Sequence, residues 1–454
     1  METLTENIEI NEQIEQKRKF DFDYFASLAW KLTELLLFLG VVLYAVQPLL
    51  VLCAKAFSLP FTQYGIFFTS SVISLIAIFV RASIFLCLNF SKTFLKSINK
   101  QKIQNFILGK WEIFVLFFAL VWTYISCLVA KNQEIVWGGN WYNIEGFWTV
   151  LKYGVIFLDA YLLRSQRLKK LFCNLLVVSG TIVGAILIHT NLQGIDFYIH
   201  FSRSVYRNSN HYGYALAVST VMAVGFAIKT KSRSLKVFYL VCFAILHANM
   251  LVSDCFGSLI GEVCGIVALF VINLLIKKSK ELLYVAISVA VIFVGVTVVL
   301  ESAKISTILQ DFSVLANDAE DIIQGESSGK EGTGRWKLWE DTAQIIIQVP
   351  WFGKGLDCYY SNDYVNGTLD MPHNEYLQIA SNVGVPVLLM YLVALFGIYF
   401  RAFKRKKELS SQSIICFGGS VGYLVSAFFG NTFTYTYPFL LILLAFGMLK
   451  NRRN

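Results

Sequence analysis

Long apolar blocks alternate with short polar connections along almost the whole chain. Each block approaches the roughly 20 residues that a helix needs to cross about 30 Å of hydrocarbon. A run such as LLLFLGVVLYAVQPLLVLC does not alternate in polarity, as a strand of a membrane barrel would. The pattern predicts an all-α polytopic membrane protein with about twelve transmembrane helices, near residues 32–53, 62–90, 111–130, 146–163, 171–190, 212–228, 237–252, 257–276, 282–300, 384–400, 412–430 and 432–449.

Basic residues are concentrated in alternate connections. Seven stretches carry 29 of the 39 Lys and Arg residues: 17–31, 81–110, 164–170, 229–236, 277–280, 401–407 and 450–453. Because basic residues near the ends of spans are retained in the cytoplasm, these stretches predict the cytoplasmic side. The first 24 residues are polar and of mixed charge, which is unlike the short basic start of a secretory signal. The tail 1–31 and the end 450–454 are therefore both expected inside.

The composition excludes an ordinary soluble enzyme. Hydrophobic residues make up 56% of the chain and charged residues only 15%, against about a quarter in typical soluble domains. The net charge of +9 is explained by the cytoplasmic connections, so no nucleic-acid partner is expected. The nine cysteines form no C-x-x-C or Cys/His ligand spacing and are interpreted as small core residues rather than a metal site.

One outer connection, residues 301–383, is long enough for ordered structure; it divides the predicted spans into 32–300 and 384–449. Within it, WEDTAQIIIQV has helical spacing and stops at Pro350. MPHNEYLQIASNVGVP predicts a second helix, with Pro372 in its first turn and Gly384 at its end. This predicts a large, partly helical extracytoplasmic loop.

Two residue types in the outer loops could carry chemistry. His373 starts the second predicted helix, where free backbone N–H groups favour an anion and an imidazole can accept a proton near neutral pH. Arg203, Arg207 and Arg335 are the arginines of the outer loops, and a guanidinium binds phosphate oxygens in a bidentate manner. The alternative interpretations are an interfacial histidine and solvated loop charges.

Several motifs together resemble the O-antigen ligase and O-antigen polymerase superfamily. They are GRWKLWEDTAQIIIQVPWFGKGLD, then PHNEYLQIASNVGVPVLLMYL, and upstream RNSNHYGYAL. They correspond to a Gly-Arg element followed by Trp, a Pro-x-x-Gly-x-Gly turn, a His-Asn pair leading into the next span, and an Asn-x-Asn element opening a middle span. One element differs from the family pattern: near residue 255 the chain reads SDCFGSL, with Phe256 where an arginine is expected. Arg203 or Arg207 could replace that arginine, and the sequence does not choose between them.

The resemblance implies glycosyl transfer from a polyprenyl-pyrophosphate-linked oligosaccharide at the outer face of a bacterial cytoplasmic membrane. It implies His373 as the base, Arg335 as the pyrophosphate ligand, and substrate contacts from Arg203, Arg207, Asn210, Asn374 and Tyr376. No cofactor is expected, and no metal, because the first outer loop, AKAFSLPF, has no acidic ligand. The lipid bilayer surrounds the protein, and other polysaccharide assembly proteins are candidate partners.

Three functions stay open at this point: a polymerase of repeat units, a ligase of finished glycan, and a flippase of lipid-linked sugars. A transporter is typically built from repeats with broken helices at the midplane, whereas the motifs here are in one outer loop. Lys outnumbers Arg by 27 to 12, which favours an AT-rich genome of the Gram-positive kind and hence a capsular or exopolysaccharide polymerase. The sugars, their linkage, the oligomeric state and the organism are not predicted.

Overall fold

The computed structural model describes residues 2–59, 62–89, 109–140, 143–192, 209–253, 255–301, 335–358 and 371–448, together with residues 317 and 324. These residues form helices and turns, and no strand occurs among them. The α-helices are α1 (Glu2–Ala56), α2 (Gln63–Asn89), α5 (Trp111–Val129), α6 (Gln133–Gly138), α7 (Phe147–Leu162), α8 (Gln166–Leu192), α10 (Ser209–Lys229), α11 (Arg233–Val252), α12 (Phe256–Ile276), α13 (Lys280–Glu301), α15 (Arg335–Gln348), α16 (Glu375–Val383), α17 (Val385–Lys404), α18 (Ser411–Ser426) and α19 (Tyr437–Gly447), with short 3-10 turns η2 (Lys406–Glu408) and η3 (Ala427–Phe429).

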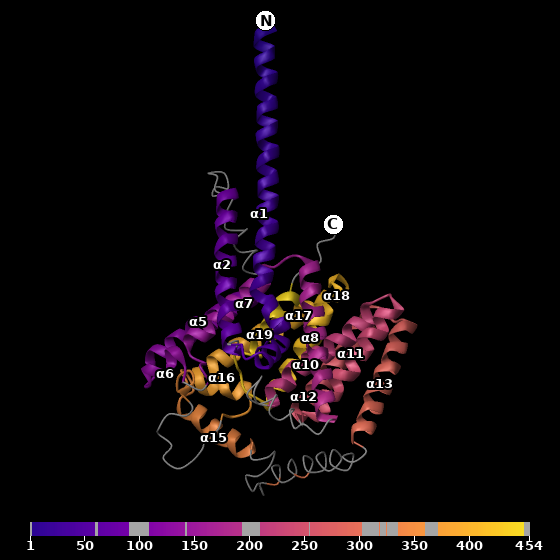
Figure 1. The fold of residues 1–454 in the computed structure, drawn as a ribbon. Coiled ribbons are helices and arrows are strands. Elements are labelled where there is room, and N and C mark those ends of the chain that lie inside the picture. Colours follow the sequence, from indigo (N-terminus) through magenta and orange to yellow (C-terminus); the bar gives the residue numbers. More distant parts are fainter. Residues whose placement is uncertain are drawn as a thin grey trace.

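Each of the twelve predicted spans coincides with one of these helices, which confirms the all-α polytopic fold. Ten of the described helices are long and apolar enough to cross a membrane, whereas α7 and α19 have 16 and 11 residues. Helix α1 begins at Glu2, so its backbone continues without a break through the expected tail. In Figure 1 the N-terminal end of α1 projects from one end of the molecule, while α15 and α16 lie at the opposite end.

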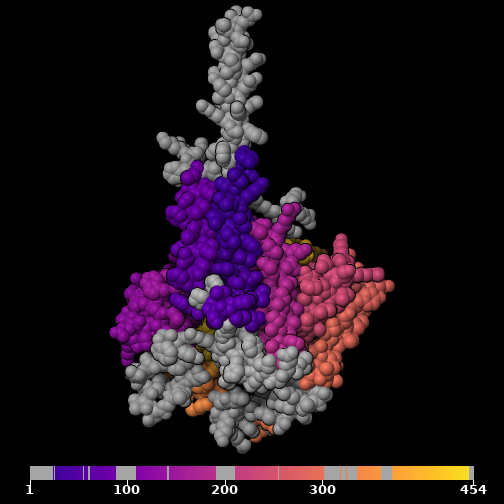
Figure 2. Space-filling view, viewed as in Figure 1, coloured from indigo at the N-terminus to yellow at the C-terminus, as the bar shows by residue number. Residues whose placement is uncertain are grey.

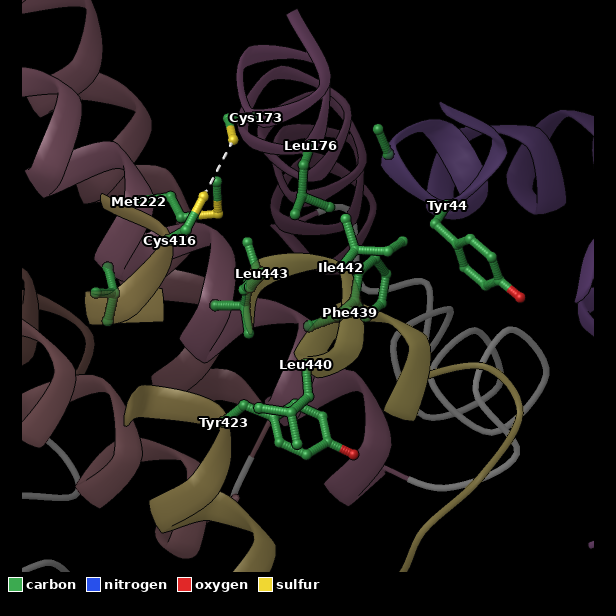
Figure 3. Packing of buried hydrophobic residues seen from close by; sticks show 14 of the residues in the cluster. Tyr44, Cys173, Leu176, Met222, Cys416, Tyr423, Phe439, Leu440, Ile442 and Leu443 are labelled. Carbon is green, nitrogen blue, oxygen red and sulfur yellow. Dashed lines mark hydrogen bonds between the residues drawn. The ribbon is translucent and has the colours of Figure 1, made fainter. Parts of the chain in front are cut away.

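Helix α10 is at the centre of the bundle. In its most apolar window 94% of the residues are buried, compared with 17% in α13 at the periphery. The core continues through α1, α8, α18 and α19, where Tyr44, Leu176, Phe439 and Ile442 pack together (Figure 3). The short helix α19 is thus surrounded by protein rather than lipid.

Glycines allow α12 and α18 to approach closely. A Cβ atom on Gly261 would collide with the backbone of Gly422 and the side chain of Ser426, and one on Gly265 would lie 3.0 Å from the carbonyl of Gly418. Without a hydrophobic driving force between helices in lipid, such small residues provide the van der Waals contact that holds a pair together. These two helices present their outer ends to the loop elements described next.

Two further pairs flank this centre. Helix α5 packs on α17, and α7 packs on α19. Figure 2 shows α1 and α2 side by side on one face of the molecule, next to the α5 region. The C-terminal end of α5 and the N-terminal end of α7 are joined through α6, which brings the first half of the chain to the same end of the molecule as α15 and α16.

Candidate functional site

Helix α15 places the turn before α16. The indole Nε1 of Trp339 donates to the carbonyl of Pro372 at 2.8 Å. Arg335 precedes Trp339 by four residues, and residues at i and i+4 lie one above the other on the same helix face. The structure therefore brings Arg335 to the side of α15 that faces the turn containing His373.

The start of α16 differs from the sequence prediction. The helix begins at Glu375, with Asn374 as its N-cap, so the expectation that Pro372 occupies the first turn is wrong. The Asn374 Oδ1 accepts from the backbone N–H groups of Tyr376 and Leu377 at 3.0 and 3.1 Å. Since these donors are occupied, they are not available for an anion. An asparagine N-cap is favoured because its side chain satisfies such otherwise unpaired groups.

His373 stands just before this cap, with φ of +48°, and is half-buried. A non-glycine residue in this left-handed region is uncommon and persists only where its surroundings hold it. Here the Trp339 contact on one side and the Asn374 cap on the other fix the backbone. The imidazole is therefore presented from a rigid turn.

Side chains of α16 bind it to the bundle. The Tyr376 hydroxyl donates to the carbonyl of Leu424 at 2.8 Å, and the Gln378 Oε1 accepts from the backbone N–H of Thr432 at the same distance. Glu375 is fully buried and accepts from the hydroxyls of Tyr391 and Tyr423 at 3.4 and 3.3 Å. Burial raises the pKa of Glu375 to about 8, so this carboxyl holds its proton at neutral pH.

The Gly-rich turn at 349–358 supports the other end of α16. Backbone N–H groups of Lys354 and Gly355 donate to the carbonyls of Ser381 and Asn382 at 2.8 and 2.9 Å. Gly384 has φ of +94°, and a Cβ there would overlap the carbonyl of Trp351. The Pro-x-x-Gly-x-Gly element thus supports the helix that follows His373.

Arg335 is half-buried at the first position of α15. Burial lowers its pKa, and its electrostatic neighbours are Tyr214 and Cys255. Within the described ranges it forms no ion pair with a carboxylate. A guanidinium stays charged even so, and a half-buried charge without an acidic partner favours an anion as its counterpart. Cys255 adjoins Phe256, so Arg335 lies beside the position at which the family arginine is missing.

The outer end of α10 and the segment 430–436 complete the site. The ring of His211 contacts those of Phe433 and Tyr435 at centroid distances of 4.4 and 5.3 Å. Tyr214 stacks on Tyr423 at 4.9 Å. The Tyr214 hydroxyl is buried and has no hydrogen-bond partner in the described part of the chain.

The structure brings together four of the seven predicted residues. Arg335, His373, Asn374 and Tyr376 lie where α15 meets α16, although Asn374 Oδ1 and the Tyr376 hydroxyl form hydrogen bonds with backbone groups of the protein. Asn210 lies in the first turn of α10, and its roles stay a prediction. Arg203 and Arg207 lie outside the described residues.

Sequence reasoning missed Tyr214, Glu375 and the segment 430–436. Glu375 was visible as a carboxylate inside the His-Asn motif, but only the structure shows that it is fully buried. Tyr214 resembles any other aromatic residue of an apolar span, and the sequence carried no signal that its hydroxyl lies close to Arg335.

Among the described residues no group of three or more His, Cys, Asp or Glu side chains is placed to hold a metal ion. The groups found at the site are instead a guanidinium, an imidazole, a buried hydroxyl and a protonated carboxyl. Such a set can bind an oxyanion and move a proton.

The fold defines a multi-pass helical membrane protein, with a candidate functional site at one end of its helix bundle. The O-antigen ligase family model matches residues 241–392, which include α12, α13, α15 and α16, the second half of α11 and the first turns of α17. The match confirms the relationship to the O-antigen ligase and O-antigen polymerase superfamily that the motifs predicted, and with it a function of that general type. No match was found among curated proteins.

Proposed function

We propose that the protein transfers a glycan from a polyprenyl-pyrophosphate carrier to a hydroxyl acceptor at the outer face of the cytoplasmic membrane. The observation that carries this proposal is the half-buried Arg335 without a carboxylate partner in the described ranges, on the same face of α15 as Trp339, which bonds to the residue before His373. The match at residues 241–392 supports a glycan-transferring enzyme.

Arg335 binds the pyrophosphate in this proposal. The leaving group develops negative charge as the glycosyl bond breaks, and a preorganised cation stabilises that charge without a metal. The buried Tyr214 hydroxyl is close enough to interact electrostatically with Arg335 and is free to donate to a phosphate oxygen.

His373 accepts the proton of the acceptor hydroxyl as its oxygen attacks the anomeric carbon. The bond from that carbon to the pyrophosphate oxygen breaks, and the electron pair leaves with the lipid pyrophosphate. The rigid turn before α16 positions the imidazole, which agrees with the geometric requirement on a general base.

The preferred reaction is polymerisation of lipid-linked repeat units into a capsular polysaccharide, exopolysaccharide or O-antigen. The second candidate is ligation of a finished glycan to another acceptor, and the family match supports both reactions equally. Single repeat units accumulating in a deletion strain support the polymerase, whereas full-length chains on the carrier support the ligase. A flippase would leave undersized lipid-linked units facing the cytoplasm.

Two substitutions test the mechanism. His373→Ala should abolish polymer because loss of a general base typically costs about 10² to 10⁴ in rate. Arg335→Lys should fail as well because lysine keeps the charge but cannot make a two-pronged phosphate contact. Polymer length is read on gels from cells that contain equal amounts of the membrane-inserted variants.

Lys337→Gln is the matched control, because Lys337 is on the same helix and its contacts with Glu340 and Asp341 are exposed. It should give normal polymer, and chelators should have no effect on the parent. Normal-length polymer from His373→Ala, or activity lost on chelation and restored by a divalent ion, would overturn this mechanism.

A further inference from the structure

A groove separates the pair α5 and α17 from the pair α7 and α19. It encloses about 1520 Å³, more than the roughly 300–1,000 Å³ of a drug-sized pocket. Its middle is lined by apolar side chains, among them Phe114, Phe117, Leu158 and Leu441. Phe117 and Leu158 are 57% and 40% exposed, so the groove is open along its side.

The two ends of this groove differ. At the outer end its lining includes the side chains of Glu145, Gln378 and Thr432. At the other end it is lined by five cations, Lys110, Arg164, Arg167, Arg401 and Arg405. These come from three segments far apart in the sequence, and by the distribution of basic residues this end faces the cytoplasm.

In the part of the chain that the structure describes, the side chains of four of the five cations form no ion pair, although the Arg164 backbone N–H donates to Glu34 at 2.9 Å. Arg401 is paired with the buried Glu112 at 2.8 Å. Within the described ranges no ion pair is formed by Lys110, Arg164, Arg167 or Arg405. Arg164, Arg167 and Arg405 are also exposed, and Lys110 lies 5.0 Å from the ring of Tyr161 on the groove wall.

We propose that this groove binds an anionic phospholipid of the inner leaflet, with its phosphate among the cations at the inner end and its acyl chains against the apolar walls. Basic pockets between transmembrane helices on the cytoplasmic side suit such head groups. A polyprenyl chain entering from the outer face would bring only its apolar end to the inner end of the groove. That apolar end would make no favourable electrostatic interaction with the cations. The proposal is independent of the reaction at the outer site.

The groove offers a substitution that should fill it without disturbing the fold. Gly154 of α7 lines the groove, is exposed, and has nothing within 4 Å of the place where a Cβ atom would stand. Leucine also has a better helix propensity than glycine. Gly295 in α13 is equally open and lies outside the groove, so Gly295→Leu is its matched control.

The test measures lipid binding to the purified full-length protein in detergent by native mass spectrometry. The added probes are phosphatidylglycerol and phosphatidylcholine. Replacing Arg164, Arg167 and Arg405 together by glutamine should weaken phosphatidylglycerol binding by about tenfold or more and leave phosphatidylcholine unchanged. Replacing Lys277, Lys278 and Lys280 by glutamine removes the same charge outside the groove and should have little effect. Gly154→Leu should lower phosphatidylglycerol occupancy, whereas Gly295→Leu should not.

Three results would overturn the proposal: equal binding of both lipids by the parent, an equal loss in the two triple variants, or unchanged binding in Gly154→Leu. Displacement of phosphatidylglycerol by a polyprenyl phosphate, with binding of that probe lost in Gly154→Leu, would assign the groove to the carrier lipid instead. His373→Ala should bind phosphatidylglycerol normally, so failure of the glycosyl-transfer mechanism and failure of this site are separable.

Discussion

Tyr214 and Arg335 show how much the site depends on single polar atoms in apolar surroundings. A buried hydroxyl that lacks a hydrogen bond is unfavourable for folding by roughly 1–3 kcal/mol. Tyr214 is 1% exposed, and its hydroxyl has no partner within the described ranges. Tyr214 interacts electrostatically with Arg335. We therefore expect an oxyanion bound by Arg335 to accept a hydrogen bond from this hydroxyl and to offset the cost.

Tyr214→Phe should therefore reduce glycan transfer while leaving the melting temperature unchanged or slightly higher. The ring stack on Tyr423 is retained and only the unpaired oxygen is removed. Tyr399→Phe is the control, because it removes a hydroxyl that does have a hydrogen-bond partner: the Tyr399 hydroxyl is bonded to that of Ser420 at 2.6 Å. A Tyr214→Phe variant with full activity would exclude the hydroxyl from the reaction.

Glu375 predicts a pH dependence of stability. Burial raises its pKa from 4.5 to about 8, so the folded state binds the proton more tightly than the unfolded chain does. The free energy of unfolding should consequently fall as the pH rises from about 4.5 to about 8. Glu375→Gln should remove this decline, which thermal unfolding in detergent between pH 5 and 8 measures.

The exposed Glu134 provides the control for this measurement. Glu134→Gln should leave the pH profile of the parent unchanged. If Glu375→Gln keeps the same decline as the parent, Glu375 is already ionised in the folded protein at neutral pH.

At the scale of elements, two separate sets of hydrogen bonds hold α16 in place, one at each end of the helix. The Asn374 cap fixes its start, while backbone N–H groups of the turn at 349–358 donate to carbonyls at its end. The same turn reaches the first half of the chain through Asp357, which accepts from the Asn140 backbone at 2.7 Å and from the Asn143 Nδ2 at 3.1 Å. One carboxylate thus joins segments more than 200 residues apart in the sequence.

Asp357→Asn should loosen this junction. An amide offers one acceptor oxygen in place of two, so either the backbone donors of Asn140 and Glu145 or the side-chain amides of Asn140 and Asn143 lose their acceptor. The expected effect is a destabilisation of about 1–3 kcal/mol, seen as faster hydrogen–deuterium exchange in the peptide containing residues 143–146. Asp341→Asn affects a partly exposed ion pair of α15 and should leave that exchange unchanged. Unchanged exchange in Asp357→Asn would show that backbone contacts alone hold the junction.

At the scale of the whole molecule, the basic connections predict which end faces the cytoplasm. The site at α15 and α16 and the cationic end of the groove must then lie on opposite sides of the membrane. In intact cells an impermeant thiol reagent should label Gly138→Cys above the background of the parent and should leave Lys278→Cys at background. Both positions are exposed, and a Cβ at Gly138 meets nothing within 4 Å. Labelling of Lys278→Cys from outside the cell would contradict this orientation of the protein in the membrane.

The sequence by itself determined where the long apolar helices lie along the chain, because burial in lipid requires long apolar segments whatever their neighbours are. Their direction across the membrane stays a prediction from the basic connections. The helices at Arg335–Gln348 and Glu375–Val383 were also predicted, from local periodicity and from the Gly384 stop. Only the tertiary structure decided that Asn374 caps its helix, that Glu375 is buried, and that Tyr214 interacts electrostatically with Arg335. Those facts depend on which distant segments meet at the outer end of the bundle, and neither periodicity nor composition carries that information.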